Sequence, residues 1–503
     1  MPLTDKAIVC ACEDVSVHDV EAAIAQGFGD IESLKRYTGL GTGPCQGKSC
    51  EAGAMRICQQ RQAVPLEAQV PFRARPPGAP TALAAYAGIP FGAGPQASGL
   101  RPQGGLKPSW GKGTHPLLPK TALPEMADVV IIGGGIMGLA LAWNLAAQGS
   151  QKILVLERGY LCEGASGRNG GGVRAQWTTP TLIELAKESI DFMGRFAQEL
   201  GINVWLRKGG YLFLAHDAET VRRIEYGAAL QKRHGLPTRV ISPVEAQEIV
   251  PQLDLSRFVA ASWNPDDGVV FPWPFLWGYA DGARKRGVQV ETFTRVTGLE
   301  VGDGRIRSVQ TDRGRVAADR VVIASGAWSP TVAKLAGVAL PNVPFRHEIV
   351  SSEPLKPFLG PLVSMLGSGL YFSQSMRGEI VGGMGDPQEV PGLNQTSSLR
   401  FLSRYARALT EIMPQVGDVK LLRQWAGCYD NTPDYSPVLG ETPGVAGLLQ
   451  MNGFVGHGFM MAPAVGRRMA AWMGGAQDEI FERFNLRRFA EGKLIQEESF
   501  IIG

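Results

Sequence analysis

The chain has 503 residues, of which 44% are hydrophobic and 19% are charged, and its formal net charge is +3. This length exceeds one ordinary domain, the composition is that of a globular protein with a large core, and the weakly basic charge gives no case for nucleic-acid binding. The first 20 residues lack the apolar stretch of a secretory signal, and no run approaches the roughly 20 apolar residues of a spanning helix. We therefore expect a cytoplasmic protein.

Residues 1–60 have the features of a small, mostly helical module. Ser16 is followed three residues later by Asp19, which is the pattern of a capping box at a helix start. Helices are predicted over 16–27, over 30–39, where glycine ends the helix, and directly after Cys50.

Four of the seven cysteines lie in this module as a Cys-x-Cys pair and a Cys-x4-Cys pair, namely Cys10, Cys12, Cys45 and Cys50. In a reducing compartment clustered cysteines bind metal more often than they form disulfides, and an odd total fits a disulfide framework poorly. Four thiolates suit an iron–sulfur cluster or a zinc ion, and a site that has lost its metal is the third alternative. The remaining cysteines are expected to be buried core thiols: Cys58, Cys162 and Cys428.

Residues 61–126 form a connector that is rich in proline, glycine and alanine and has no clear periodicity. Such a segment is unusual inside a compact domain, so we expect a linker that wraps over a surface. Residues 127–503 have the pattern of one large α/β unit.

The α/β unit opens with a nucleotide-binding pattern. A buried strand at 128–132 leads into Gly133, Gly135 and Gly138, then a helix, and then a second strand that ends at Glu157. The first glycine permits a tight turn, the second lets the backbone approach a pyrophosphate, and the third lets the helix pack on the strand, while the acid binds ribose hydroxyls. The ordered set predicts a dinucleotide site rather than a glycine-rich turn without ligand, but it does not separate FAD from NAD.

Further strands are expected later in the unit. Runs at 211–214, 288–293 and 321–325 fit buried strands, and those at 370–372 and 379–382 alternate as in an antiparallel sheet.

Four ordered motifs resemble those of the D-amino-acid oxidase/glycine oxidase/sarcosine oxidase family. Residues 157–174 resemble its second flavin signature and 321–329 its second nucleotide-contacting turn, while 432–434 and 453–460 resemble its flavin-ring loop and closing helix. The resemblance implies an α/β fold in which a FAD-binding Rossmann-like domain is interleaved with a mixed β-sheet substrate domain. It assigns FAD binding to Gly133, Gly135, Gly138, Glu157, Arg158, Ser166, Arg168, Val296, Gly326, Trp328, Gly453, Gly456, Gly458, Phe459 and Met460.

The resemblance also implies substrate residues. Arg174 is similar by position to the family arginine that pairs with a substrate carboxylate, and a buried arginine bound to phosphate or backbone is the alternative. Tyr371 aligns with an active-site tyrosine, and His457 and His347 are placed near the flavin ring, although a core tyrosine and structural histidines would look the same. Met460 replaces a lysine that is the family's second carboxylate partner, so the carboxylate is held differently or the substrate is bulkier.

The N-terminal cysteine spacing resembles that of the bacterioferritin-associated-ferredoxin type of [2Fe-2S] domain, as found in opine oxidase and hydrogen cyanide synthase complexes. With flavin chemistry adjacent, this resemblance favours a [2Fe-2S] cluster over zinc. It also implies a hetero-oligomer with a pyridine-nucleotide-reductase-like partner subunit, and a peripheral membrane electron acceptor stays open.

Covalent attachment of FAD is not expected. The linking cysteine of some relatives would fall at Gly427, so attachment through its neighbour Cys428 is the alternative. The histidine through which the multi-subunit sarcosine oxidase attaches FMN would fall at Pro272, which leaves open a non-covalent FMN at a subunit interface.

The expected activity is that of a FAD-dependent dehydrogenase resembling opine, hydroxyproline or glycine dehydrogenases. It would oxidise the C–N bond of an amino acid or secondary amine (opine, hydroxyproline, sarcosine or glycine-like) by hydride transfer to flavin, and electrons would leave through the cluster and a partner subunit. The alternatives are an oxidase that makes peroxide and a subunit that only relays electrons. Several oxidases of the family activate oxygen with a lysine, and Ile380 in its aligned place favours the dehydrogenase.

Overall fold

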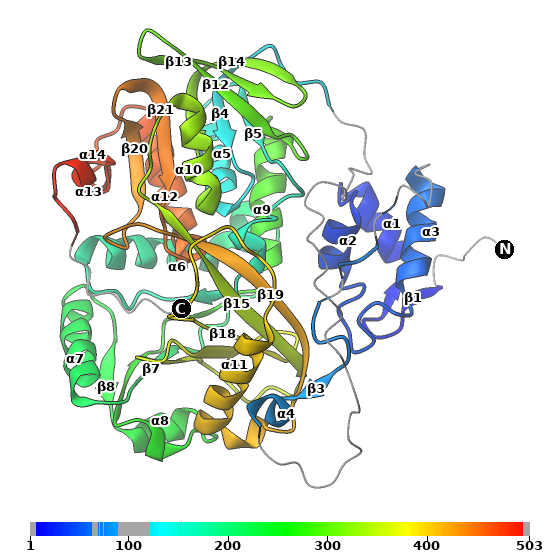
Figure 1. Cartoon of the computed structure of the whole chain (residues 1–503), viewed down its shortest axis with the longest axis vertical. Coiled ribbons are helices and arrows are strands. Elements are labelled where there is room, and N and C mark those ends of the chain that lie inside the picture. Colours follow the sequence, from blue (N-terminus) through cyan, green and yellow to red (C-terminus); the bar gives the residue numbers. More distant parts are fainter. Residues whose placement is uncertain are drawn as a thin grey trace.

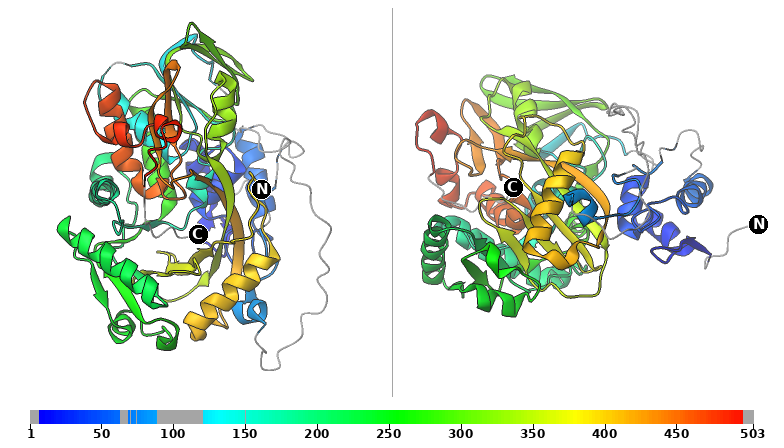
Figure 2. Two further views of the ribbon diagram at one scale, coloured as in Figure 1. Left: turned by 60° about the vertical axis from the view of Figure 1, so that its left-hand side comes forward. Right: turned by 60° about the horizontal axis from the view of Figure 1, so that its bottom comes forward.

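The computed structural model describes residues 7–62, 69, 71–73, 75–88, 121–149 and 151–495, so most of the predicted connector lies outside the described residues. Two sheet-containing domains are stacked on each other, and the N-terminal helices lie against one side of them (Figures 1 and 2). Among the described residues, none of the helices has the length and apolar character needed to span a membrane.

The three helices predicted in the N-terminal module are present. Ser16 and Asp19 form the reciprocal capping box of the first helix, and the Asp30 side chain caps the second, which ends at Gly39 with φ of +85°. The elements of the module are β1 (Ile8–Cys10), β2 (Val15–Ser16), α1 (Val17–Ala25), α2 (Ile31–Thr38) and α3 (Glu51–Gln62).

Part of the connector is built into the second domain. Strand β3 (Thr81–Ala82) pairs with β19 (Lys420–Asn431) and forms the edge of the second sheet, and α4 (Leu83–Ala87) follows it directly. Leu83 is fully buried, and its backbone N–H donates to the Val419 carbonyl. The expectation of a plain surface linker is therefore wrong for these residues, since the proline- and alanine-rich composition hid a short strand and helix.

The first domain is an eight-stranded sheet with a parallel centre, as the apolar runs predicted. Its central strand β4 is buried on both faces: Val129 and Ile131 share a core with helices α5, α9 and α12, and Val130 and Ile132 share another with β12, β13, β14 and α10. The strands are β4 (Met126–Ile132), β5 (Ile153–Leu156), β11 (Gln289–Glu291), β12 (Val296–Gly302), β13 (Arg305–Thr311), β14 (Gly314–Ile323), β20 (Val438–Thr442) and β21 (Val445–Asn452). The helices of this domain are α5 (Ile136–Ala146), α6 (Pro180–Leu200), α9 (Pro272–Lys285), α10 (Ser329–Ala333), α12 (Gly458–Met473), α13 (Ile480–Arg483) and α14 (Arg487–Ala490).

The second domain is a nine-stranded mixed sheet, as expected. Strand β16 runs parallel to β7, and the remaining pairs are antiparallel. Its strands besides β3 and β19 are β7 (Tyr211–Ala215), β8 (Arg239–Ile241), β9 (Ala260–Asn264), β15 (Val343–Pro354), β16 (Leu362–Met365), β17 (Tyr371–Gln374) and β18 (Glu379–Met384). Helices α7 (Ala218–Arg233), α8 (Pro243–Ile249) and α11 (Leu399–Ile412) cover it, and a small ladder of β6 (Gly172–Val173) and β10 (Gly268–Val269) lies apart.

The chain passes repeatedly between the two sheets. Segments of the first domain therefore alternate along the sequence with those of the second, and the pocket described next is lined by both.

Candidate active site

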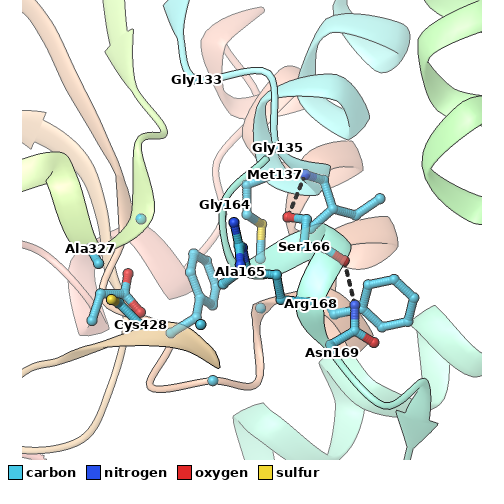
Figure 3. Close-up of a pocket in the computed structure, with 18 of the residues that line it drawn as sticks. Gly133, Gly135, Met137, Gly164, Ala165, Ser166, Arg168, Asn169, Ala327 and Cys428 are labelled. Atoms are coloured by element: carbon cyan, nitrogen blue, oxygen red, sulfur yellow. Dashed lines mark hydrogen bonds between the residues drawn. The ribbon is translucent and has the colours of Figure 1, made fainter. Parts of the chain in front are cut away.

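The glycine turn after β4 leaves one position open to a ligand (Figure 3). Gly133 has φ of +123°, and a Cβ there would lie 2.4 Å from the Ala324 carbonyl oxygen, while a Cβ on Gly138 would lie 2.1 Å from the Gly133 oxygen. Those two glycines are required by the packing of the turn itself. A Cβ on Gly135 would meet only the Ser166 hydroxyl, at 3.1 Å. Gly135 is thus the glycine whose missing side chain makes room in the pocket.

Glu157 lies immediately after β5 and faces the same turn. Its carboxylate accepts from the backbone N–H groups of Gly134 and Gly159, each at 2.9 Å. Burial raises the pKa of Glu157, and the two N–H donors oppose that shift. A carboxylate held in this way presents its oxygens where the sequence pattern places ribose hydroxyls.

One pocket extends from this turn to the second sheet. It contains 13 of the 15 residues to which FAD binding was assigned: Gly133, Gly135, Glu157, Arg158, Ser166, Arg168, Val296, Gly326, Trp328, Gly456, Gly458, Phe459 and Met460. Gly138 packs behind the turn instead, and the Gly453 N–H donates to buried Asp430 at 2.6 Å. Neither lines the pocket, so their assignment as contact residues is not supported by this geometry.

The phosphate-binding end of the pocket suits an anion. Helix α5 begins at Gly135 without a side-chain cap, and the Ile136 N–H donates to the Ser166 hydroxyl at 3.0 Å. The start of a helix and the nearby Arg158 and Arg168 attract negative charge. The residues present therefore fit the pyrophosphate and ribose of FAD.

Arg174 lies at the other end of the pocket and is fully buried. Its guanidinium donates to the Gln176 carbonyl at 2.6 Å and to Nε2 of His457 at 3.3 Å. It also stacks over the Trp177 ring at 4.0 Å. These contacts fix the planar group in one orientation, as is needed for bidentate binding of a carboxylate.

His347 and Tyr371 face the same space. The two side chains form a 3.0 Å hydrogen bond, and the His347 ring stacks on Tyr429 with ring centres 4.7 Å apart. Burial lowers the pKa of His347 to about 4, so this ring is neutral near pH 7. Tyr429 and Tyr211 also line the pocket, and the sequence analysis missed both because an isolated tyrosine at a strand has no distinguishing pattern.

Asp267 stabilises the part of the pocket that contains Arg174. It is fully buried and accepts from the Ala175 N–H at 2.7 Å, from the Gln176 amide and from the Asn264 amide, the last two at 3.0 Å. It therefore fixes the backbone directly after Arg174. No sequence motif marks it, because Asn264 is its one local partner and the other two, Ala175 and Gln176, lie more than 90 positions away.

One expectation about the second sheet is corrected. Ile380 is buried in the core of that sheet and does not line the pocket, whereas its neighbour Val381 points toward Gly170, which does. Adjacent strand residues face opposite sides, so the alignment is displaced by one residue. Asp434, in the segment that resembles the flavin-ring loop, forms a buried ion pair with Arg488 at 2.7 Å.

The three additional cysteines are buried, as expected. Cys428 alone among them lines the pocket, and its thiol donates to the Asn394 carbonyl at 3.4 Å. Burial raises its pKa to about 11, so the thiol is protonated near neutral pH.

The four cysteines of the N-terminal module lie together as free thiols in two pairs. Cys12 interacts electrostatically with Cys45 and Cys10, and Cys50 interacts electrostatically with Cys10 and Cys45, so the two pairs adjoin each other. In the part of the chain that the structure describes, no three His, Cys, Asp or Glu side chains converge as ligands of one metal ion. A [2Fe-2S] cluster needs two thiolates at each iron, so two adjoining pairs fit it better than a single zinc ion.

Both the N-terminal module and the α/β unit match known protein families. Residues 128–472 match the FAD dependent oxidoreductase family, and residues 4–89 match the sarcosine oxidase A3 domain. The chain is 31% identical over 378 residues to sarcosine oxidase subunit beta of Rhodobacter capsulatus, covering 74% of this chain and 90% of that protein. It is 27% identical over 369 residues to mitochondrial dimethylglycine dehydrogenase of Rattus norvegicus, covering 69% of this chain and 43% of that protein.

Solved structures agree with this placement. L-proline dehydrogenase from P. horikoshii superposes with a TM-score of 0.71 at 34% identity, covering 74% of this chain and all of that one. Glycine oxidase from Geobacillus kaustophilus superposes with a TM-score of 0.66 at 25% identity, covering 73% of this chain and 99% of that one. The glycine turn, the buried acid at the end of β5 and the family match together establish that this chain belongs to the FAD dependent oxidoreductase family.

Proposed function

We propose that the chain is a dehydrogenase that oxidises the C–N bond of an amino acid or secondary amine and passes the electrons on through its N-terminal module. The observation that carries this proposal is Arg174, a buried and fixed guanidinium in a pocket whose lining also includes Tyr211, Tyr371 and Tyr429. The relatives of this chain include enzymes named for sarcosine, dimethylglycine, proline and glycine. Each of these four compounds carries a carboxylate near the reacting nitrogen.

The pocket residues would bind and orient the substrate. Arg174 would hold the carboxylate, and the rings of Tyr211, Tyr371 and Tyr429 would surround the amine end. Bound FAD supplies the acceptor for a hydride from the α-carbon. His347 is neutral, so it can accept a hydrogen bond from a substrate amine or from Tyr371 without adding positive charge. A substrate that binds with its amine deprotonated needs no strong base.

We further propose that the four cysteines hold a [2Fe-2S] cluster. Their arrangement in two adjoining pairs supports this cluster over zinc. Since Ile380 does not reach the pocket, the preference for a dehydrogenase over a peroxide-forming oxidase rests on this cluster alone.

A partner subunit of the pyridine-nucleotide-reductase type is part of the proposal, and the relatives named as sarcosine oxidase subunit beta support a multi-subunit assembly. A non-covalent FMN is not part of it. Helix α9 begins at Pro272, where the FMN-linking histidine of the relative would fall, and it packs against the N-terminal module: Arg36 stacks over Trp273, while Phe28 and Tyr37 contact Trp277.

The test is an anaerobic screen of secondary and cyclic amino acids that follows bleaching of the flavin absorption. Bleaching by at least one carboxylate-bearing amine, with rapid reduction of an artificial dye and slow peroxide formation, is the expected result. If oxygen reoxidised the reduced flavin as fast as the dye did, and cluster-free variants turned over normally, the dehydrogenase proposal would be wrong.

A further inference from the structure

The loop that carries Cys45 is joined directly to strand β19. Gln46, the next residue, has an unusual positive φ of 56°, and its side-chain amide donates to the Leu422 carbonyl and, at 2.9 Å, to the Pro77 carbonyl. Positive φ is disfavoured for a residue with a side chain, so the two bonds must compensate for this conformation. The Gln46 side chain thus links the cysteine loop to β19.

The loops around Cys12 and Cys45 are fixed at the same place by two arginines of the second sheet. Arg377 forms an ion pair with Glu13, the residue after Cys12. Arg423 of β19 donates to the Thr42 carbonyl, close to the second cysteine loop. The N-terminal module therefore docks on the second sheet through the end that carries Cys12 and Cys45. Figure 1 shows the module on the side of the molecule where β19 lies.

One face of β19 runs from this contact to the pocket. Alternate residues of a strand share a face, so Arg423, Trp425, Gly427 and Tyr429 lie on the same side. Arg423 touches the module, and Gly427 and Tyr429 line the pocket. Gly427 lies five positions after Leu422, which spans roughly 17 Å along an extended strand.

Trp425 occupies the middle of that interval. Its indole N–H donates to the Arg168 carbonyl at 2.8 Å, and Arg168 lines the pocket. The Arg168 guanidinium in turn donates a 3.0 Å hydrogen bond to the Ala426 carbonyl of β19. The guanidinium of Arg75, in the connector, lies 6.0 Å from the Trp425 ring and interacts electrostatically with Glu32 of the module. The indole ring thus contacts the pocket wall directly and reaches the docked module through Arg75.

We propose that this face of β19 conducts electrons from the flavin pocket to the four cysteines, with the Trp425 ring as the aromatic element of the route. The inference rests on the proposed function, because it needs both FAD and the cluster. Oxidation of one C–N bond releases two electrons and two protons. The electrons cross β19 one at a time, the protons pass to water, and a one-electron acceptor outside the chain takes each electron from the cysteine site.

The test separates flavin reduction from cluster reduction in the full-length holoenzyme. Under anaerobic single-turnover conditions, stopped-flow absorbance follows flavin bleaching, and freeze-quenched electron paramagnetic resonance follows the reduced cluster. Trp425→Leu should bleach its flavin at the wild-type rate but reduce its cluster more slowly, on the order of tenfold. Trp425→Phe, which keeps an aromatic ring, should restore most of the rate. Trp205→Leu, at a half-exposed tryptophan outside the pocket, is the matched control.

Equal cluster-reduction rates in wild type and Trp425→Leu would overturn the route. A wild-type protein that lacks iron and sulfide, or whose cluster is not reduced by a substrate that bleaches its flavin, would instead refute the proposed function. If Trp425→Leu does not fold, Gln46→Leu tests the same route at its other end, with Lys48→Leu as control because the Lys48 side chain donates to the Gly78 carbonyl, whereas that of Gln46 donates to Leu422 of β19. Slower cluster reduction in Gln46→Leu alone supports the route, and equal rates in both variants overturn it.

Discussion

The guanidinium of Arg174 donates a 3.3 Å hydrogen bond to Nε2 of His457, although the two residues are 283 positions apart. Burial, and then the positive charge of Arg174, hold the pKa of His457 well below its usual range. His457 is therefore a neutral acceptor that orients the arginine, and the positive charge at this end of the pocket belongs to Arg174. A carboxylate is the natural ligand for that charge.

Removal of that charge should weaken substrate binding. Arg174→Ala should raise KM for carboxylate-bearing amines by the equivalent of about 2–5 kcal/mol, the cost of truncating one partner of a buried charge pair. Amines without a carboxylate serve as the internal control, since their KM should not change. Steady-state kinetics at equal FAD content decide the matter, and an unchanged KM for the carboxylate substrates would exclude Arg174 as their partner.

Substitutions of Gly135 and Gly138 should affect FAD binding and protein stability differently. Gly135→Val should give a folded protein without FAD, because the new side chain enters the pocket and meets little else. Gly138→Ala should instead lower the melting temperature, because its Cβ would lie 2.1 Å from the Gly133 carbonyl oxygen. Flavin absorbance and thermal unfolding measured on both variants separate the two effects. Tight FAD binding by Gly135→Val would contradict the assignment.

The metal content should be that of an iron–sulfur protein. Purified protein should contain about two iron and two sulfide per chain and little zinc. Cys45→Ser or Cys50→Ser should lose the iron while FAD remains bound, since neither cysteine lines the pocket. Cys58→Ser, at a buried cysteine outside the four, is the control and should keep its iron. Stoichiometric zinc without sulfide would refute the cluster.

FAD should be released by acid or heat. Cys428 lines the pocket, but its pKa is raised to about 11 by burial, and its thiol is bonded to the Asn394 carbonyl, so the reactive thiolate is scarce. Precipitating the protein with acid and measuring flavin in the supernatant tests this directly. Flavin that stays with the denatured chain in wild type, but not in Cys428→Ala, would show a covalent bond at that residue.

Stability should fall in acid partly because of His347. Burial lowers its pKa in the folded state to about 4, whereas an unfolded histidine titrates near 6.5. Between these two pH values the unfolded chain binds a proton that the folded chain does not, so this contribution to stability is complete above 6.5 and declines toward pH 4, by on the order of 3 kcal/mol. In His347→Gln the melting temperature should fall less over that window than in wild type. The exposed His216→Gln is the control, and identical profiles for wild type and His347→Gln would contradict the prediction.

The sequence by itself determined the elements whose signals are local. The capping box at Ser16 and the glycine turn after β4 each depend on neighbours within a few positions, and the acid that follows β5 depends on the order of strand, helix and strand; all three formed where expected. The apolar runs were enough to predict an α/β unit with some antiparallel strands, whereas the second, mixed sheet was implied by the family resemblance.

Only the tertiary structure decided which distant residues meet. Tyr211 and Tyr429 reach the pocket, Asp267 fixes the backbone beyond Arg174, and Trp425 lies between the pocket and the module because strands far apart in sequence are brought into register. The one-residue displacement at Ile380 has the same origin. A strand presents alternate residues to opposite faces, and the packing of the sheet, rather than the local sequence, selects which face meets the flavin pocket.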